Sequence, residues 1–131
     1  MNLYRGFESY LTKCAFLKHR ISYCEKGIYG KAVYATSDET MALTYASGDK
    51  KCVAKFTVSD EYIKSLSSNQ VSVICTGKRS LKRTFETASE HPNLYDYAKK
   101  NKIKAILIKY KNSDELVIYD KSIIQDIQNY I

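Results

Sequence analysis

The stretch Gly30-Lys31-Ala32-Val33-Tyr34-Ala35-Thr36-Ser37-Asp38 decides the fold that this sequence predicts. Gly27 and Gly30 interrupt the pattern that precedes it, because glycine favours turns over regular elements. Residues 32–36 then predict a strand that ends in an aromatic side chain and turns directly into a helix. The strand of this unit therefore carries Tyr34, and its helix carries a second tyrosine, Tyr45.

The helix of this unit has start and stop signals. Thr36 or Ser37 is the expected N-cap, and Thr36 with Glu39 has the spacing of a capping box. Asp38 and Glu39 add acidic side chains to the first turn, where they suit the helix dipole. Gly48 is expected to end the helix. The predicted buried stripe consists of Met41, Ala42, Tyr45 and Ala46.

Residues outside this unit predict more strands and short helices, all within one domain over residues 1–131. The expected strands are Asn2 to Gly6, Lys51 to Val58, Val71 to Thr76, Ile103 to Tyr110 and Glu115 to Asp120, the last two joined by a hairpin loop over 111–114. The other expected elements are a helix from Phe7 to about Ile21, a helical turn at Asp60 to Leu66, a long surface loop at Gly77 to His91, a helix from Pro92 to about Asn101, and a closing helix or turn at Lys121 to Ile131. This order predicts the α+β class with antiparallel strands.

Charge and composition favour some classes of binding partner but do not identify one. The chain is 44% hydrophobic and 27% charged, which is ordinary for a soluble globular protein. Its net charge of +7 favours anionic partners such as nucleotides, nucleic acid or acidic protein surfaces. The N-terminus lacks the apolar core of a signal peptide, and no apolar run is long enough to span a bilayer. We therefore expect a cytoplasmic protein, or one delivered into a host cytoplasm, with no membrane partner.

The four cysteines give little support to a metal site. They are widely spaced and form no C-x-x-C pair, whereas structural zinc usually uses close ligand pairs. No metal is expected. Cys14, Cys24, Cys52 and Cys75 are predicted to be reduced thiols, most of them buried.

Three blocks of the sequence, in order, resemble the catalytic domain of the poly(ADP-ribose) polymerases, within the ADP-ribosyltransferase superfamily. The stretch 30–35 is similar to the motif G-K-G-[IV]-Y-F-A-D, and Tyr45 follows Tyr34 by eleven residues, as the second family tyrosine does within S-x-S-A-x-Y. Leu3-Tyr4-Arg5-Gly6 stands in the place of the first-strand motif L-x-H-G. Residues 115–124 are similar to the final segment E-Y-[IV]-V-Y-D-x-x-[QI]-[IV]. The resemblance implies an ADP-ribosyltransferase-like fold, with antiparallel strands in a split sheet and short flanking helices.

The resemblance also implies an activity and a site. It implies an NAD-dependent enzyme that cleaves the bond between nicotinamide and ribose and transfers ADP-ribose to a protein or nucleic-acid acceptor. NAD is the expected co-substrate. Glu115 is the implied catalytic carboxylate, and the implied NAD-binding residues are Arg5, Gly6, Tyr34, Ala35 and Tyr45. A standalone domain of this size resembles bacterial or phage effectors and toxins.

These residue types suit the chemistry of NAD cleavage. The reaction passes through a cationic, oxocarbenium-like state, which the Glu115 carboxylate would stabilise. Aromatic faces attract the flat cationic nicotinamide ring, so Tyr34 and Tyr45 would clamp it. The backbone of Gly6 would bond the carboxamide, and Arg5 would hold a phosphate or ribose oxygen.

The sequence departs from the polymerases at two positions. Arg5 replaces their histidine, and Ala42 replaces their serine. An arginine on the first strand resembles instead the R-S-E branch of toxins and mono-ADP-ribosyltransferases. Ser113 stands where arginine-modifying members often have glutamine or glutamate, which argues against arginine as the acceptor. The chain is therefore interpreted as a divergent member between the branches, and mono-ADP-ribosyl transfer is expected in so short a chain.

Other functions remain open from the sequence. The same cleft would also serve a catalytically inactive module that binds NAD, ADP-ribose or a partner protein, because a fold does not fix a function. The net charge of +7 would also suit a nucleic-acid-binding domain. The resemblance also implies RNA 2′-phosphate transfer as an alternative activity on the same fold, although the sequence does not identify the paired basic residues of that activity.

Overall fold

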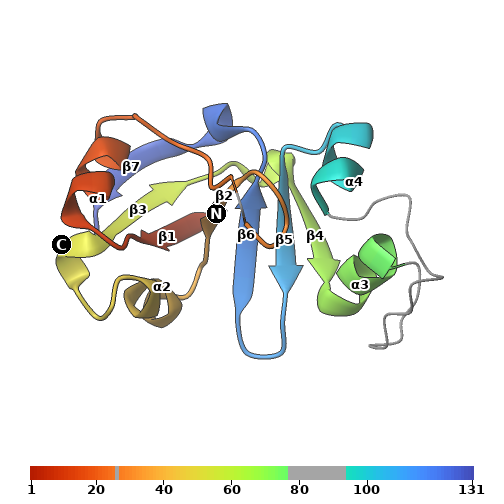
Figure 1. The fold of residues 1–131 in the computed structure, drawn as a ribbon, viewed down its shortest axis with the longest axis horizontal. Helices are drawn as coiled ribbons and strands as arrows, with labels where there is room; N and C mark the ends of the chain where they lie inside the picture. Colours follow the sequence, from red (N-terminus) through yellow and green to blue (C-terminus); the bar gives the residue numbers. More distant parts are fainter. Residues whose placement is uncertain (26, 77–93) are drawn as a thin grey trace.

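The computed structural model describes residues 1–25, 27–76 and 94–131 (Figure 1). The strands are β1 (Asn2–Gly6), β2 (Val33–Ala35), β3 (Val53–Thr57), β4 (Ile63–Ser67), β5 (Ala105–Lys109), β6 (Asp114–Ile118) and β7 (Gln125–Asn129). The α-helices are α1 (Tyr10–Leu17), α2 (Glu39–Tyr45), α3 (Ser68–Thr76) and α4 (Leu94–Lys100). Single 3₁₀ turns form at η1 (Lys50–Cys52), η2 (Asp60–Tyr62) and η3 (Lys121–Ile123). The protein belongs to the α+β class, as the sequence predicts.

The strands form two sheets that lie side by side (Figure 1). One sheet has the order β1-β3-β7, and the other has the order β2-β6-β5-β4. The sheets meet where Tyr4 of β1 pairs with Thr36, the residue after β2. The Tyr4 N–H donates to the Thr36 carbonyl at 2.7 Å, and the Thr36 N–H donates back to the Tyr4 carbonyl at 3.0 Å. This bridge places the first strand against the strand–helix unit that was identified in the sequence.

Apolar side chains from both sheets fill the interior. Phe16 of α1 packs on Phe56 of β3 with ring centroids 5.5 Å apart, so α1 covers the three-stranded sheet. Leu94 and Ala98 of α4 pack against Ile106 of the four-stranded sheet. Burial of each large apolar side chain contributes roughly 2 kcal/mol to folding. These clusters hold the sheets in place beneath the site described below.

Most of the predicted elements are present. The strands at the N-terminus, at 33–35 and at 53–57, the helix at 39–45 and the hairpin of β5 with β6 are confirmed. The first helix is shorter than predicted, at Tyr10–Leu17. The helix expected near Pro92 is confirmed over Leu94–Lys100, whereas Pro92 and the predicted loop at 77–91 lie outside the described residues.

The strand predicted at Val71 to Thr76 is wrong, because these residues belong to helix α3. A reciprocal cap starts this helix. The Ser67 N–H donates to Gln70 Oε1 at 2.8 Å, and the Gln70 N–H donates to Ser67 Oγ at 3.1 Å. This capping box outweighs the β-branched side chains that favoured a strand.

The helical turn predicted at Asp60 to Leu66 is wrong beyond its first residues. It covers only Asp60–Tyr62, and strand β4 follows at once. β4 pairs with β5 in parallel, so the expectation of antiparallel strands fails for this pair. The other described strand pairs are antiparallel.

The closing helix or turn predicted at Lys121 to Ile131 is a 3₁₀ turn followed by a strand. Asp120 caps η3, since its Oδ1 accepts the Ser122 N–H at 3.0 Å. β7 then forms the edge of the three-stranded sheet. Its side chains are largely exposed there, and this hides the alternation that marks a strand.

The N-cap of α2 is Asp38 and neither Thr36 nor Ser37, because Asp38 Oδ1 accepts the Thr40 N–H at 2.9 Å. The two expected caps contact Asp114 instead. Thr36 Oγ1 donates to the Asp114 carbonyl at 2.9 Å, and the Ser37 N–H donates to Asp114 Oδ1 at 2.9 Å. These bonds tie the turn after β2 to the start of β6.

The four cysteines form no disulfide within the described part of the chain. The expectation that most are buried is wrong, since Cys24 is exposed and only Cys52 is fully buried. Gly48 follows α2 with φ of +80°, and its N–H donates to the Leu43 carbonyl at 2.7 Å. This conformation suits glycine and confirms the predicted stop.

Candidate functional site

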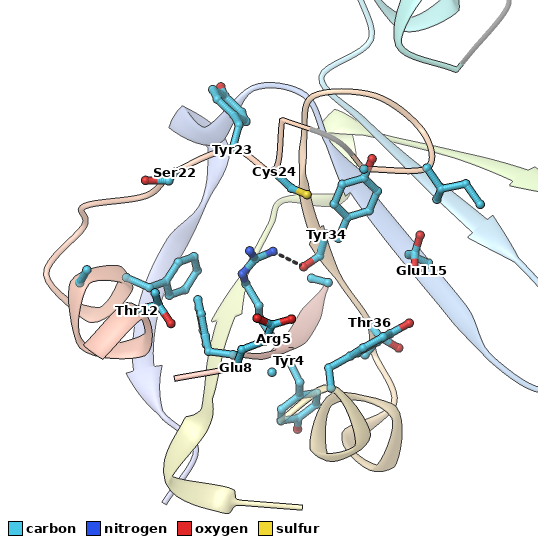
Figure 2. Close-up of a pocket in the computed structure, with 18 of the residues that line it drawn as sticks. Tyr4, Arg5, Glu8, Thr12, Ser22, Tyr23, Cys24, Tyr34, Thr36 and Glu115 are labelled. Atoms are coloured by element: carbon cyan, nitrogen blue, oxygen red, sulfur yellow. Dashed lines mark hydrogen bonds between the residues drawn. The ribbon is translucent and has the colours of Figure 1, made fainter. Parts of the chain in front are cut away.

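A cavity of about 570 Å³ lies where the two sheets meet. Its size falls in the range of small-molecule sites, roughly 300–1,000 Å³. Figure 2 shows Arg5 in the middle, with Tyr34 and Glu115 to one side and Thr12 of α1 to the other. The six residues assigned to the site from the sequence all line it: Arg5, Gly6, Tyr34, Ala35, Tyr45 and Glu115. The structure thus brings together residues from β1, β2, α2 and β6.

Arg5 extends from β1 into the cavity and retains unused hydrogen-bond donors. Its Nη1 donates to the Tyr34 carbonyl at 2.7 Å, and its guanidinium carbon lies 5.0 Å from the centre of the Phe7 ring. Its Nε is buried without a hydrogen-bond partner, and no carboxylate of the described residues lies within 4.0 Å. Burial lowers the pKa of Arg5, although a guanidinium stays charged. An anionic ligand would supply the missing counter-charge.

Glu115 lies on β6 opposite Ile108 of β5. Burial raises the pKa of the Glu115 carboxyl above its ordinary value. No hydrogen bond or ion pair engages this carboxyl within the described part of the chain. Glu115 lines the same cavity as Tyr34 and Tyr45, and its charge contributes to the raised pKa values of both tyrosines. The cavity therefore has a cationic group at its centre and a carboxylate on one wall.

Tyr34 is held by hydrogen bonds within the protein. Its Oη donates to the Gly30 carbonyl at 2.6 Å and accepts the Tyr29 N–H at 3.1 Å. Burial raises the pKa of Tyr34 to about 12, so the phenol remains protonated and keeps donating. A Cβ added at Gly27 would lie 2.1 Å from Tyr34 Oη, which explains the glycine there. The ring therefore has a fixed position on the cavity wall.

Tyr45, in contrast, is 53% exposed at the end of α2, so its place in the predicted buried stripe is wrong. Its hydroxyl has no hydrogen-bond partner among the described residues. Its position depends on how closely α2 approaches β1. A Cβ added at Gly6 would lie 2.1 Å from the Ala42 carbonyl and 2.9 Å from the Ala46 nitrogen. Glycine at position 6 thus brings α2, and with it Tyr45, to the mouth of the cavity.

The backbone of Gly6 is turned away from β3. The Phe7 N–H donates to the Cys52 carbonyl at 2.8 Å, and successive residues of a strand direct their backbone groups to alternate edges. The N–H and carbonyl of Gly6 therefore face the edge on which Tyr4 pairs with Thr36. Gly6 itself lines the cavity along this edge.

The remaining positions from the sequence motifs contribute small side chains. Ala35 lines the cavity and pairs with Leu116 in the sheet. Ala42 is completely buried beneath Gly6 and is not among the residues that line the cavity. No hydroxyl group is presented at this position.

Sequence reasoning missed the side of the cavity formed by α1 and the segment after it. The missed lining residues include Glu8, Thr12, Arg20, Tyr23, Cys24 and Ile28. Most of them lie outside regular elements, so no periodicity marks them. The turn glycines at 27 and 30 are the local signal that the chain folds back here.

Comparison with known protein families, with curated proteins and with solved structures finds no match to this chain. Within the described ranges, no helix is long and apolar enough to cross a membrane.

Proposed function

We propose that this chain is a small NAD-dependent mono-ADP-ribosyltransferase with a divergent ADP-ribosyltransferase-like fold. The observation that carries the proposal is the convergence of Arg5, Gly6, Tyr34, Tyr45 and Glu115 on one cavity. The sequence motifs imply the same residues as a set, although they are far apart along the chain. Two adjacent sheets with short helices are compatible with the fold that this proposal requires.

The nicotinamide half of NAD has matching groups in the cavity. Arg5 supplies an unpaired cation for an oxygen of the pyrophosphate or ribose. The rings of Tyr34 and Tyr45 would stack on the nicotinamide, whose positive charge favours aromatic faces. The edge of β1 at Gly6 would bond the carboxamide through its backbone N–H and carbonyl. This arrangement directs the nicotinamide ribose toward Glu115.

In the proposed reaction the bond between ribose C1′ and the nicotinamide nitrogen breaks, and its electron pair leaves with neutral nicotinamide. The ribose develops positive charge, which the Glu115 carboxylate stabilises. The acceptor nucleophile then forms a bond to C1′ and releases a proton. Glu115 has no counter-charge within the described residues, so its charge is available to this cation. The acceptor is a protein side chain or a nucleic-acid base.

A second candidate function is binding of NAD or ADP-ribose without transfer. Ala42 favours it, because this buried alanine offers no hydroxyl to the ligand where the polymerases have a serine. Both candidates require the same cavity and differ in turnover.

The test incubates the purified protein with NAD labelled in its ADP-ribose part and a cell lysate. Nicotinamide release and label transfer are both measured. Glu115→Gln is expected to lower both by ~100-fold, as loss of a catalytic carboxylate does. Glu61→Gln is the matched control, because Glu61 is an exposed glutamate on η2 outside the cavity.

Each outcome separates the candidates. Turnover by the unaltered protein and by Glu61→Gln, with loss in Glu115→Gln, supports the transferase. Equal turnover by all three proteins removes Glu115 from its role. Binding of NAD in calorimetry without any nicotinamide release supports the binding module and contradicts the enzyme.

A further inference from the structure

A second cavity of about 670 Å³ lies on the other side of α1, next to η1 and β7. Tyr10 and Lys13 of α1 line it, whereas Thr12, Ala15 and Phe16 of the same helix line the first cavity. The other lining residues are Asp49, Lys51, Asn129 and Ile131. Neither the sequence motifs nor the proposed NAD chemistry uses this cavity.

Lys13 is the unusual residue of this second cavity. Lys13 is only 3% exposed. No other charged residue in the described parts of the chain is buried to this degree. Its Nζ donates to Asn129 Oδ1 at 2.5 Å and lies 5.5 Å from the centre of the Tyr10 ring. Because both neighbours line the cavity, the ammonium group lies at its wall.

The charge of Lys13 is not neutralised within the described residues. No carboxylate lies within 4.0 Å of its Nζ. Asp49 lines the same cavity, but its Oδ1 accepts the Lys51 N–H at 2.9 Å and its Oδ2 lies 3.7 Å from Cys52 Sγ. Asp49 is thus used as the cap of η1. A buried cation with a neutral amide as its hydrogen-bond partner calls for an anion.

We propose that this second cavity binds a phosphate group through Lys13, either as inorganic phosphate or as a phosphate ester. The Lys13 ammonium has three donors, and Asn129 takes one of them. Lys51 adds an exposed second cation on the same wall. A compact ammonium binds phosphate as a point charge. The volume exceeds the need of one phosphate, so the rest of an ester has space beside the Tyr10 ring.

The first experiment titrates inorganic phosphate into the unaltered protein and follows backbone amide shifts, with sodium chloride at equal ionic strength as the reference. Saturable shifts are expected at Tyr10, Lys13, Lys51 and Asn129 beyond those caused by chloride. Shifts confined to residues elsewhere, or no saturation, would overturn the proposal. This experiment needs no variant, and its result does not depend on whether the protein cleaves NAD.

The second experiment compares Lys13→Met with Lys18→Met, a control in which an exposed lysine just after the same helix is changed. Lys13→Met is expected to weaken phosphate binding at least tenfold, and Lys18→Met to leave it unchanged. Equal binding by both variants would contradict the assignment to Lys13. In the same amide-shift measurement, AMP is expected to act on the residues of the second cavity as phosphate does and adenosine to leave them unshifted, whereas equal shifts with adenosine at these residues would overturn the role of the phosphate group.

Discussion

The two tyrosines of the first cavity are eleven residues apart, yet the protein holds them in opposite ways. Tyr34 lies on β2, and its hydroxyl makes two hydrogen bonds within the protein. Tyr45 lies at the end of α2, is more than half exposed, and has no such bond in the described residues. Tyr34 is therefore part of the fold as well as of the site, whereas Tyr45 is free to adjust to a ligand. A motif spacing alone does not reveal this difference.

The largest expected effect is the difference in free energy of unfolding between the variants that remove Tyr34 and Tyr45. Tyr34→Ala removes a packed ring and leaves the Gly30 carbonyl and the Tyr29 N–H without their partner, so the free energy of unfolding should fall by about 4 kcal/mol. Tyr45→Ala should cost less than about 1 kcal/mol, as surface changes do. Urea denaturation measures both values. Similar losses in the two variants would contradict the comparison.

The next effect concerns how α2 positions Tyr45. Gly6→Ala would force a Cβ against the backbone of Ala42 and Ala46, which no side-chain rotation relieves. The free energy of unfolding should fall by about 3 kcal/mol. A crystal structure of the variant should show α2 and Tyr45 displaced with Tyr34 unmoved. Gly48→Ala serves as the control for a glycine with open space around it, although its positive φ carries a cost of about 1 kcal/mol. If Gly6→Ala cost no more than Gly48→Ala, the close packing of β1 and α2 would be refuted.

A smaller effect is expected on NAD binding. Tyr45→Ala should weaken NAD binding about tenfold, because a stacked aromatic contact is worth roughly 1 kcal/mol or more. Leu11→Ala is the control, since Leu11 is a large side chain that is 80% exposed and lines neither cavity. Isothermal titration calorimetry measures both affinities. Unchanged affinity in Tyr45→Ala would remove this ring from the site.

The smallest expected effect concerns Glu115, which lines the same cavity as both tyrosines. Burial raises its pKa in the folded protein, so the unfolded chain releases this proton first as the pH rises. The contribution of Glu115 to stability is therefore fully present below its ordinary pKa of about 4.3 and is lost as the pH rises through the folded pKa. Glu115→Gln should raise the midpoint of thermal unfolding, relative to the unaltered protein, more at pH 7 than at pH 4. Calorimetric scans at both pH values check this, and an equal difference would speak against the raised pKa.

The sequence predicted the elements that carry the site because their signals are local. The glycines before Val33 and the acidic residues Asp38 and Glu39 at the start of the helix identify the β2–α2 unit without reference to the rest of the chain. The motif blocks also selected six residues that line one cavity in the structure. Their roles toward NAD remain predictions.

One error came from overlooking a local helix-start signal, and the others arose where tertiary contacts decide the structure. The cap formed by Ser67 and Gln70 converts an apolar stretch into helix α3. β7 has exposed side chains along an edge, and its strand depends on pairing with β3. The wall formed by α1 and the following segment could not be found from the sequence, because those residues meet the cavity only after the sheets have come together.

The most direct test of the central claim is a crystal structure of Glu115→Gln with bound NAD, in which slow turnover preserves the ligand. We predict that the nicotinamide ring lies between Tyr34 and Tyr45, with a ribose hydroxyl within hydrogen-bond distance of the side chain at position 115. The pyrophosphate or a ribose oxygen should contact Arg5. NAD bound elsewhere on the protein, or with its nicotinamide away from both tyrosines, would contradict the account.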